Sequence, residues 1–122
     1  MKKQIISWLS EIEKRDGRPP EGVIAFNFGL IESNKGYQMY LVGAYEYSED
    51  NDDWACIEPP VKPYRYLRLP EKIQSLPWEY ALDFCINTLT EMDEENMFDG
   101  TVLKDALAIT TGFDDGELIK IR

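Results

Sequence analysis

Hydrophobic positions near the start of the chain repeat at intervals of three and four residues: Ile5, Trp8, Leu9 and Ile12. This spacing is typical of one face of an amphipathic helix. The pattern stops at segment 16–20, which contains a glycine and two prolines that cannot continue a helix. The sequence therefore predicts a short first helix that packs through one face.

Two runs rich in β-branched and aromatic residues follow, at positions 23–31 and 37–46. The segment between them contains Asn34 and Gly36, which tolerate the positive φ of a hairpin loop. We therefore expect a β-hairpin. Alternate positions of the first run are apolar or small on both faces, so we expect this strand to lie inside the sheet rather than at its edge.

The middle of the chain offers shorter candidates, at 54–57 and 64–69. Prolines lie between them, so we expect short strands near an edge or a turn. From Pro77 onward the sequence has its clearest helical stripe, formed by Trp78, Leu82, Cys85, Ile86, Leu89 and Met92. This stripe predicts the second main helix.

Two alternating runs near the end, 106–113 and 117–121, flank Asp114, Asp115 and Gly116. An Asp-Gly pair between such runs is a strong signal for a hairpin. The order of elements predicts an α+β fold in a single domain, residues 1–122. Its mainly antiparallel sheet would carry two main helices packed on it and a C-terminal β-hairpin.

Composition narrows the possible functions. The chain has 122 residues, of which 43% are hydrophobic, enough for one core. Its 23 acidic and 13 basic residues give a net charge of −10, which disfavours binding to nucleic acid. There is no histidine, so Ser/His and Cys/His nucleophiles and His-ligated zinc are excluded. We find no motif for catalysis, a cofactor or a metal, and expect a protein that is not an enzyme.

Two features bear on the compartment. Cys56 and Cys85 both lie in apolar stretches, where we expect reduced core thiols. The first residues are basic, but Glu11 and Glu13 interrupt the apolar stretch that a signal peptide needs. No apolar run is long enough to span a membrane. We therefore expect a cytoplasmic protein.

The most unusual segment is 46–58, which holds six carboxylates and no basic residue. The calcium-loop pattern is absent, because Trp54 stands where that pattern needs its third oxygen ligand. One interpretation is a solvated loop that aids solubility. The other is an interface for a basic protein, in which aromatic anchors lie among the carboxylates, with Tyr64 and Tyr66 adjacent across the sheet. The candidate partner-binding residues are Tyr45, Tyr47, Glu49, Asp50, Asp52, Asp53, Trp54 and Glu58.

A second acidic segment, 91–99, has five carboxylates and no base. It falls where the second main helix should end, and negative charge there opposes the helix dipole. The helix must therefore fray near Glu91 or bear this cost for another reason.

Segments 24–30, 41–44, 52–56 and 112–118 together resemble small bacterial immunity proteins of polymorphic and contact-dependent toxin systems. The resemblance implies a cytoplasmic inhibitor that neutralises a cognate toxin domain, often a basic nuclease, by occluding its active site or an adjacent surface. Because the sequence has no long apolar run and no cofactor motif, we also expect no membrane partner and no cofactor. Two alternatives remain open: a general protein-interaction or regulatory module, and a small-molecule-binding domain.

Overall fold

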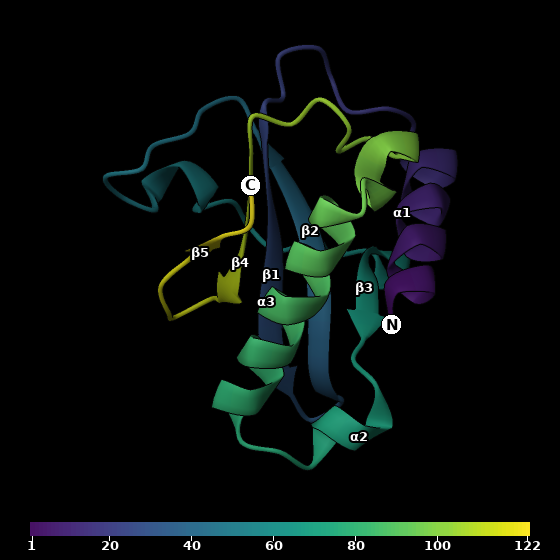
Figure 1. Cartoon of the computed structure of the whole chain (residues 1–122), viewed down its shortest axis with the longest axis vertical. Helices are drawn as coiled ribbons and strands as arrows, with labels where there is room; N and C mark the ends of the chain where they lie inside the picture. The colour runs from purple at the N-terminus through teal and green to yellow at the C-terminus, as the bar shows by residue number, and fades with distance from the viewer.

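Five of the predicted strands pair into one sheet, with strand order β3-β2-β1-β4-β5 (Figure 1). The computed structural model describes all residues, 1–122. The helices and strands are α1 (Lys2–Asp16), β1 (Ala25–Ser33), β2 (Gly36–Ala44), β3 (Tyr66–Arg68), α2 (Glu71–Gln74), α3 (Trp78–Glu94), β4 (Ala108–Phe113) and β5 (Ile119–Lys120). Short 3₁₀ helices lie between them: η1 (Asp53–Ala55), η2 (Pro63–Arg65) and η3 (Met97–Gly100).

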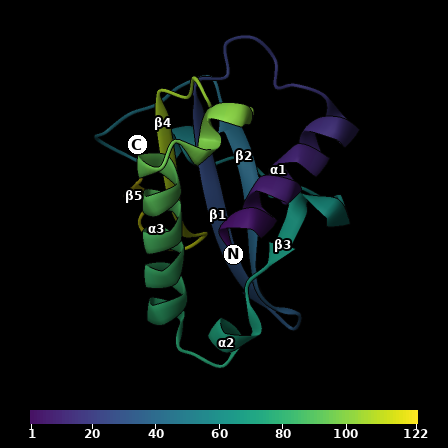
Figure 2. The ribbon, with the colours of Figure 1, turned by 45° about the vertical axis from the view of Figure 1, so that its right-hand side comes forward.

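The sheet is mainly antiparallel, as predicted. Strand β1 lies at its centre, antiparallel to β2 and parallel to β4, and β3 and β5 pair antiparallel at the two edges. The β1–β2 turn is shorter than expected, since Ser33 already pairs with Gly36, whose φ is +88°. Helices α1 and α3 both cover the same face of the sheet (Figures 1 and 2). The α+β fold and its C-terminal hairpin are confirmed.

The buried residues of the first helix agree fully with the prediction, and those of the second main helix agree only in part. All four predicted core residues of α1 are buried. On α3, three residues of the predicted stripe are buried: Cys85, Leu89 and Met92. Leu82 and Ile86 are only half-buried. Trp78 is 53% exposed, so its assignment to the core was wrong. The buried face is instead completed by Ala81 and Thr88.

The carboxylates at the end of α3 are balanced by cations from distant parts of the chain. Lys2 Nζ lies 3.3 Å from Glu91 and 2.8 Å from Glu95. Arg122 lies 2.6 Å from Asp93, and it also donates to backbone carbonyls of segment 103–106. These pairs offset the unfavourable helix dipole, and α3 continues to Glu94 rather than fraying at Glu91.

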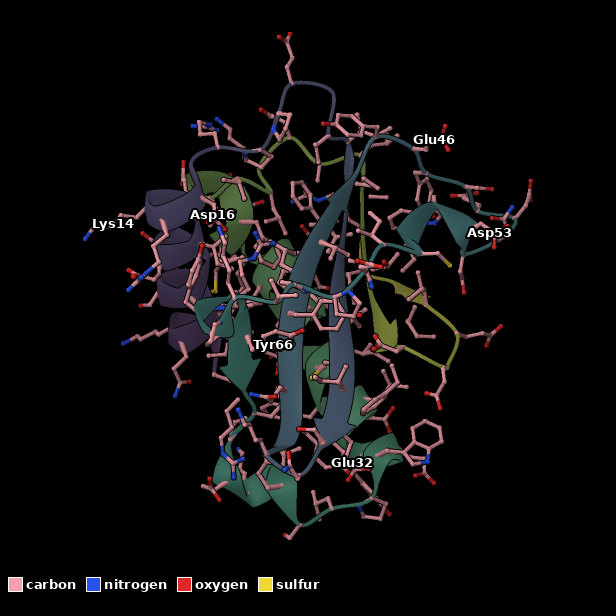
Figure 3. The ribbon with its side chains drawn as sticks, turned by 180° about the vertical axis from the view of Figure 1, so that it is seen from behind. Lys14, Asp16, Glu32, Glu46, Asp53 and Tyr66 are labelled. Atoms are coloured by element: carbon pink, nitrogen blue, oxygen red, sulfur yellow. The ribbon has the colours of Figure 1, made fainter.

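The second face of the sheet carries no helix. Figure 3, which looks onto this face, shows the chain after β2 passing through η1 and then crossing in front of the strands to η2. Beneath this covering segment, 45–65, Asn27 and Thr110 are buried, and the Thr110 hydroxyl donates to Asn27 Oδ1 over 3.0 Å. The Tyr66 hydroxyl ties the segment to the sheet by donating to the Pro60 carbonyl over 2.6 Å.

Two predictions for this segment were wrong. Residues 54–57 do not form a strand, because they lie outside the sheet with no strand to pair with, and part of them forms η1. For the same reason Cys56 is exposed rather than buried in the core. Cys85 is buried, as predicted, and both thiols are free. The candidate strand at 64–69 is reduced to the three residues of β3.

Position 29 requires glycine because the Tyr40 ring on the neighbouring strand lies very close to its backbone. Gly29 pairs with Tyr40, whose ring lies flat against it, so that a Cβ at this position would be 2.2 Å from Tyr40 Cζ. The Tyr40 hydroxyl donates to Asp114 at the start of the C-terminal turn. This ring therefore joins β2, β1 and the C-terminal hairpin.

No helix of the protein combines the length and the apolar character that crossing a membrane requires.

We expect Gly29→Ala to destabilise the fold by about 1–3 kcal/mol, because the added methyl group would overlap the Tyr40 ring. Gly100→Ala is the matched control, since a Cβ there has no atom within 4 Å. Urea unfolding monitored by circular dichroism measures both. Equal stability of the two variants would show that the Tyr40 ring can move aside without cost.

Candidate functional site

The acidic segment 46–58 folds back on the last strand of the sheet. Asp52 Oδ2 accepts a hydrogen bond from the Leu118 amide over 3.2 Å. Glu49 forms an ion pair with Lys120, the only cation bonded to this segment, at 2.7 Å. The turns inside the segment are closed locally, since the Ser48 hydroxyl and the Asn51 amide oxygen accept from backbone amides two residues later. Two of its carboxylates therefore anchor the loop to the C-terminal hairpin, and its turns are closed by bonds within the segment.

The aromatic candidates and their expected neighbours lie in four separate places. Tyr47 and Trp54 pack edge to face with ring centres 5.2 Å apart, and Lys120 lies over the Tyr47 ring at 5.7 Å. Both rings are half-buried and steady the loop. Tyr45 is 61% exposed and lies at the start of the segment. The expected neighbours from the sheet do not join them, because Tyr66 packs on Tyr40. Tyr64 lies instead beside α1, where its hydroxyl donates to Asp16.

The structure adds three carboxylates that the sequence did not single out: Asp114, Asp115 and Glu117. They lie in the turn of the C-terminal hairpin, which contacts the acidic loop through Asp52 and Leu118. The sequence of this segment predicts a hairpin turn, and the same residues show that the turn is acidic. We call the two segments together, 46–58 and 114–118, the acidic surface. Figure 3 labels Glu46 and Asp53 on its side of the molecule, with Lys14 on the opposite side.

Most carboxylates of the acidic surface have no cation. Asp52 and Asp114 accept hydrogen bonds, and Glu49 pairs with Lys120. The other six form no ion pair and no side-chain hydrogen bond: Glu46, Asp50, Asp53, Glu58, Asp115 and Glu117. The segment 91–99 differs, because Lys2 and Arg122 neutralise three of its five carboxylates. Of the two acidic segments, only the first leaves an unbalanced charge on the surface.

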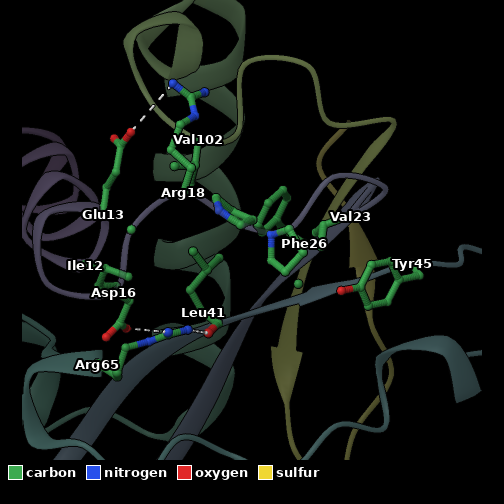
Figure 4. Close-up of a pocket in the computed structure, with 14 residues that line it drawn as sticks. Ile12, Glu13, Asp16, Arg18, Val23, Phe26, Leu41, Tyr45, Arg65 and Val102 are labelled. Atoms are coloured by element: carbon green, nitrogen blue, oxygen red, sulfur yellow. Dashed lines mark hydrogen bonds and ion pairs between the residues drawn. The ribbon is translucent and has the colours of Figure 1, made fainter.

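A cavity of about 270 Å³ lies elsewhere, between the end of α1 and the β2 strand (Figure 4). Its wall is apolar at Phe26 and Leu41, and Tyr45 points into it from one side (Figure 4). Its charged groups are already paired with one another. Glu13 lies 3.8 Å from Arg18, and Arg65 bridges Asp16 and the Leu41 carbonyl.

Asp16 is the centre of this charge network. It accepts from the Tyr64 hydroxyl, from Arg65 at 2.9 Å and from Lys62 at 3.4 Å. These donors, the Tyr64 hydroxyl first, lower the pKa of the Asp16 carboxyl to about 2. Arg65 Nε is the one buried side-chain polar atom of the chain with no partner, so Arg65 is held by its two terminal nitrogens. The network fastens η2 to the end of α1.

Two buried groups, the Tyr40 hydroxyl and the Cys85 thiol, are held in the protonated state. Burial, with the neighbouring Asp114 carboxylate, raises the pKa of the Tyr40 hydroxyl far above its ordinary value. Burial raises the pKa of the Cys85 thiol to about 12, so no thiolate forms there near neutral pH. No group of three or more Cys, Asp or Glu side chains is arranged to hold a metal ion. The carboxylates of the acidic surface remain as the main concentration of unpaired charge.

No protein-family model, no curated protein and no solved structure matches this chain.

The lowered pKa of Asp16 predicts a pH-dependent contribution to stability. The carboxyl has its ordinary pKa near 3.8 when unfolded and about 2 when folded, so its stabilising effect is full above pH 4. The effect is lost as the pH falls from 4 toward 2. We expect Asp16→Asn to be less stable than the unmodified protein at pH 7, with the difference shrinking at pH 2.5. Urea midpoints at pH 7, 4 and 2.5 measure this.

Asp105→Asn is the control for that series, because Asp105 is exposed and forms no ion pair. A difference between Asp16→Asn and the unmodified protein that stays constant across the three pH values would rule out the Asp16 network as its source.

Proposed function

We propose that this protein binds a basic protein partner through the acidic surface and inhibits it by occlusion, in the manner of the bacterial immunity proteins that its sequence resembles. The partner is a toxin domain, and the complex forms in the cytoplasm. The observation that carries the proposal is the set of six unpaired carboxylates on a loop and a turn that are fastened to each other.

The energetics favour a surface of this kind over a solvated loop. Like charges that gather without counter-charges repel one another and cost stability, and the chain neutralises its other acidic segment with Lys2 and Arg122. A basic partner would relieve the repulsion. It would also be attracted from a distance, since a concentrated negative field accelerates the encounter with a positive surface.

Occlusion of the active site would inhibit a nuclease toxin because of the way such an enzyme binds its substrate. An enzyme that binds a polyphosphate backbone needs basic residues around its active site. An acidic surface competes for those same residues. Aromatic groups near the carboxylates, here Tyr45 and the half-buried Trp54, would supply the apolar contacts that charge alone does not give.

The direct test is capture of the partner from a lysate of the native host at about 50 mM salt, followed by a wash at about 0.5 M, where exposed charge pairs are strongly screened. Mass spectrometry then identifies the proteins released. The proposal expects one basic protein, with a toxin domain, whose activity falls when this protein is added. A captured protein that is not a toxin and keeps its activity would favour the regulatory module instead.

We expect Asp50→Lys with Asp53→Lys to slow association with that partner about fivefold or more at low salt. Neither side chain forms a hydrogen bond, so the fold should be kept, and Asp52 is left unchanged because it anchors the loop. Stopped-flow or biosensor kinetics measure the rate.

Asp99→Lys with Asp105→Lys changes the net charge equally, at exposed positions in η3 and the turn after it. In Figure 1 the η3 segment, 97–100, lies beside α1, whereas the η1 segment, 53–55, lies on the opposite side of the view. An equal slowing by both double variants would mean that only net charge matters, and would remove the acidic surface from the account.

A further inference from the structure

A groove of about 550 Å³ lies where β1, α3 and the C-terminal hairpin meet. Its apolar part is formed by Leu30, Ile31 and Phe113, and the ring of Trp78 stands at its side. Three carboxylates complete it: Glu32, Asp114 and Asp115. Figure 3 shows Glu32 at the lower end of the sheet. The groove shares the 114–116 turn with the acidic surface.

Trp78 is held in place without being buried. Its ring packs edge to face on Phe113, with the centres 6.0 Å apart at 82°, and Phe113 packs in turn against the buried Tyr37. Yet 53% of Trp78 remains exposed. The first turn of a helix does not require a tryptophan. A fixed aromatic ring with more than half of its surface open is a typical anchor for a partner.

The charges of the groove define what can bind beside this ring. None of its carboxylates forms an ion pair, and no Lys or Arg lines the groove. A cation placed against an indole ring is attracted by the negative face of the ring. Carboxylates beside the ring add charge-assisted hydrogen bonds. A planar guanidinium satisfies both, since it stacks on the ring and donates two parallel bonds to a carboxylate.

We propose that this groove binds an arginine side chain presented by the protein partner. The aliphatic stem of the arginine would lie along Ile31 and Phe113, the guanidinium against Trp78, and its N–H groups would donate to Glu32 or Asp115. The inference rests on the proposed function in one respect, that the partner is a basic protein. A second copy of this chain is the poorer occupant, because its net charge of −10 opposes the approach to an acidic groove.

The test uses a probe that does not require the partner. Acetyl-Gly-Arg-Gly-amide is titrated into the ¹⁵N-labelled protein, and acetyl-Gly-citrulline-Gly-amide serves as the neutral probe of the same shape. The three indole N–H signals report separately on Trp78, on Trp54 in the acidic loop and on Trp8, which donates to the Tyr64 carbonyl. We expect the arginine probe to shift the Trp78 indole and the amides of 114–116, with millimolar affinity, and the citrulline probe to leave them unchanged.

Matched variants separate the groove from general acidity. We expect Trp78→Ala to weaken binding of the arginine probe about twofold to fivefold, as for an exposed cation–π contact. Tyr80→Ala is the control, because Tyr80 is 61% exposed on the same helix but does not line the groove. Asp115→Asn should weaken binding, and Asp83→Asn, an exposed carboxylate outside the groove, should not.

Three results would overturn the inference. Equal shifts with the citrulline probe would show an apolar groove that does not select a cation. Loss of affinity in Tyr80→Ala equal to that in Trp78→Ala would show general attraction to the surface. A Trp78 signal that moves with protein concentration alone would identify a second copy as the occupant.

The captured partner gives the final comparison. Trp78→Ala should weaken its binding and Tyr80→Ala should not. A failure to capture any basic protein would contradict the proposed function while leaving the result of the peptide titration intact, so the two proposals can fail separately.

Discussion

The structure depends on how the second face of its sheet is covered. Helices α1 and α3 cover one face, and β1 at the centre needs cover on the other as well. Two features provide this cover. The Tyr40 ring lies on Gly29, and its hydroxyl donates to Asp114. Segment 45–65 crosses the same face of the sheet. Glu49 and Asp52 also fasten the outer part of this segment to the C-terminal hairpin. We therefore expect the backbone that carries the acidic surface to be ordered.

The carboxylates that join distant parts of the fold are paired with cations or hydrogen-bond donors. Asp16 is surrounded by donors that fasten η2 to α1, and Lys2 and Arg122 neutralise the end of α3. The acidic surface differs, because Lys120 is the only cation paired with its carboxylates. Its concentrated negative charge is the feature on which the proposed binding function rests.

Much of the fold could be predicted from local patterns, but contacts between distant residues could not. The spacing of Ile5 to Ile12 and the two apolar faces of β1 are properties of short segments. Periodicity shows which face of a helix is apolar but not how far the core extends along it, so Trp78 was placed in the core. The acidic loop was found from its composition. Its hydrogen bond with Leu118 and the pairing of Lys2 with Glu95 join segments that no local pattern relates.

We infer that the acidic surface is preformed, because its loop covers the sheet. Backbone ¹⁵N relaxation of the free protein tests this directly, by giving an order parameter for each amide. The account predicts values for residues 50–58 close to those of β1 and β2, about 0.8 or higher. Values below about 0.6 in the loop, with normal values in the strands, would show a mobile chain and contradict the claim.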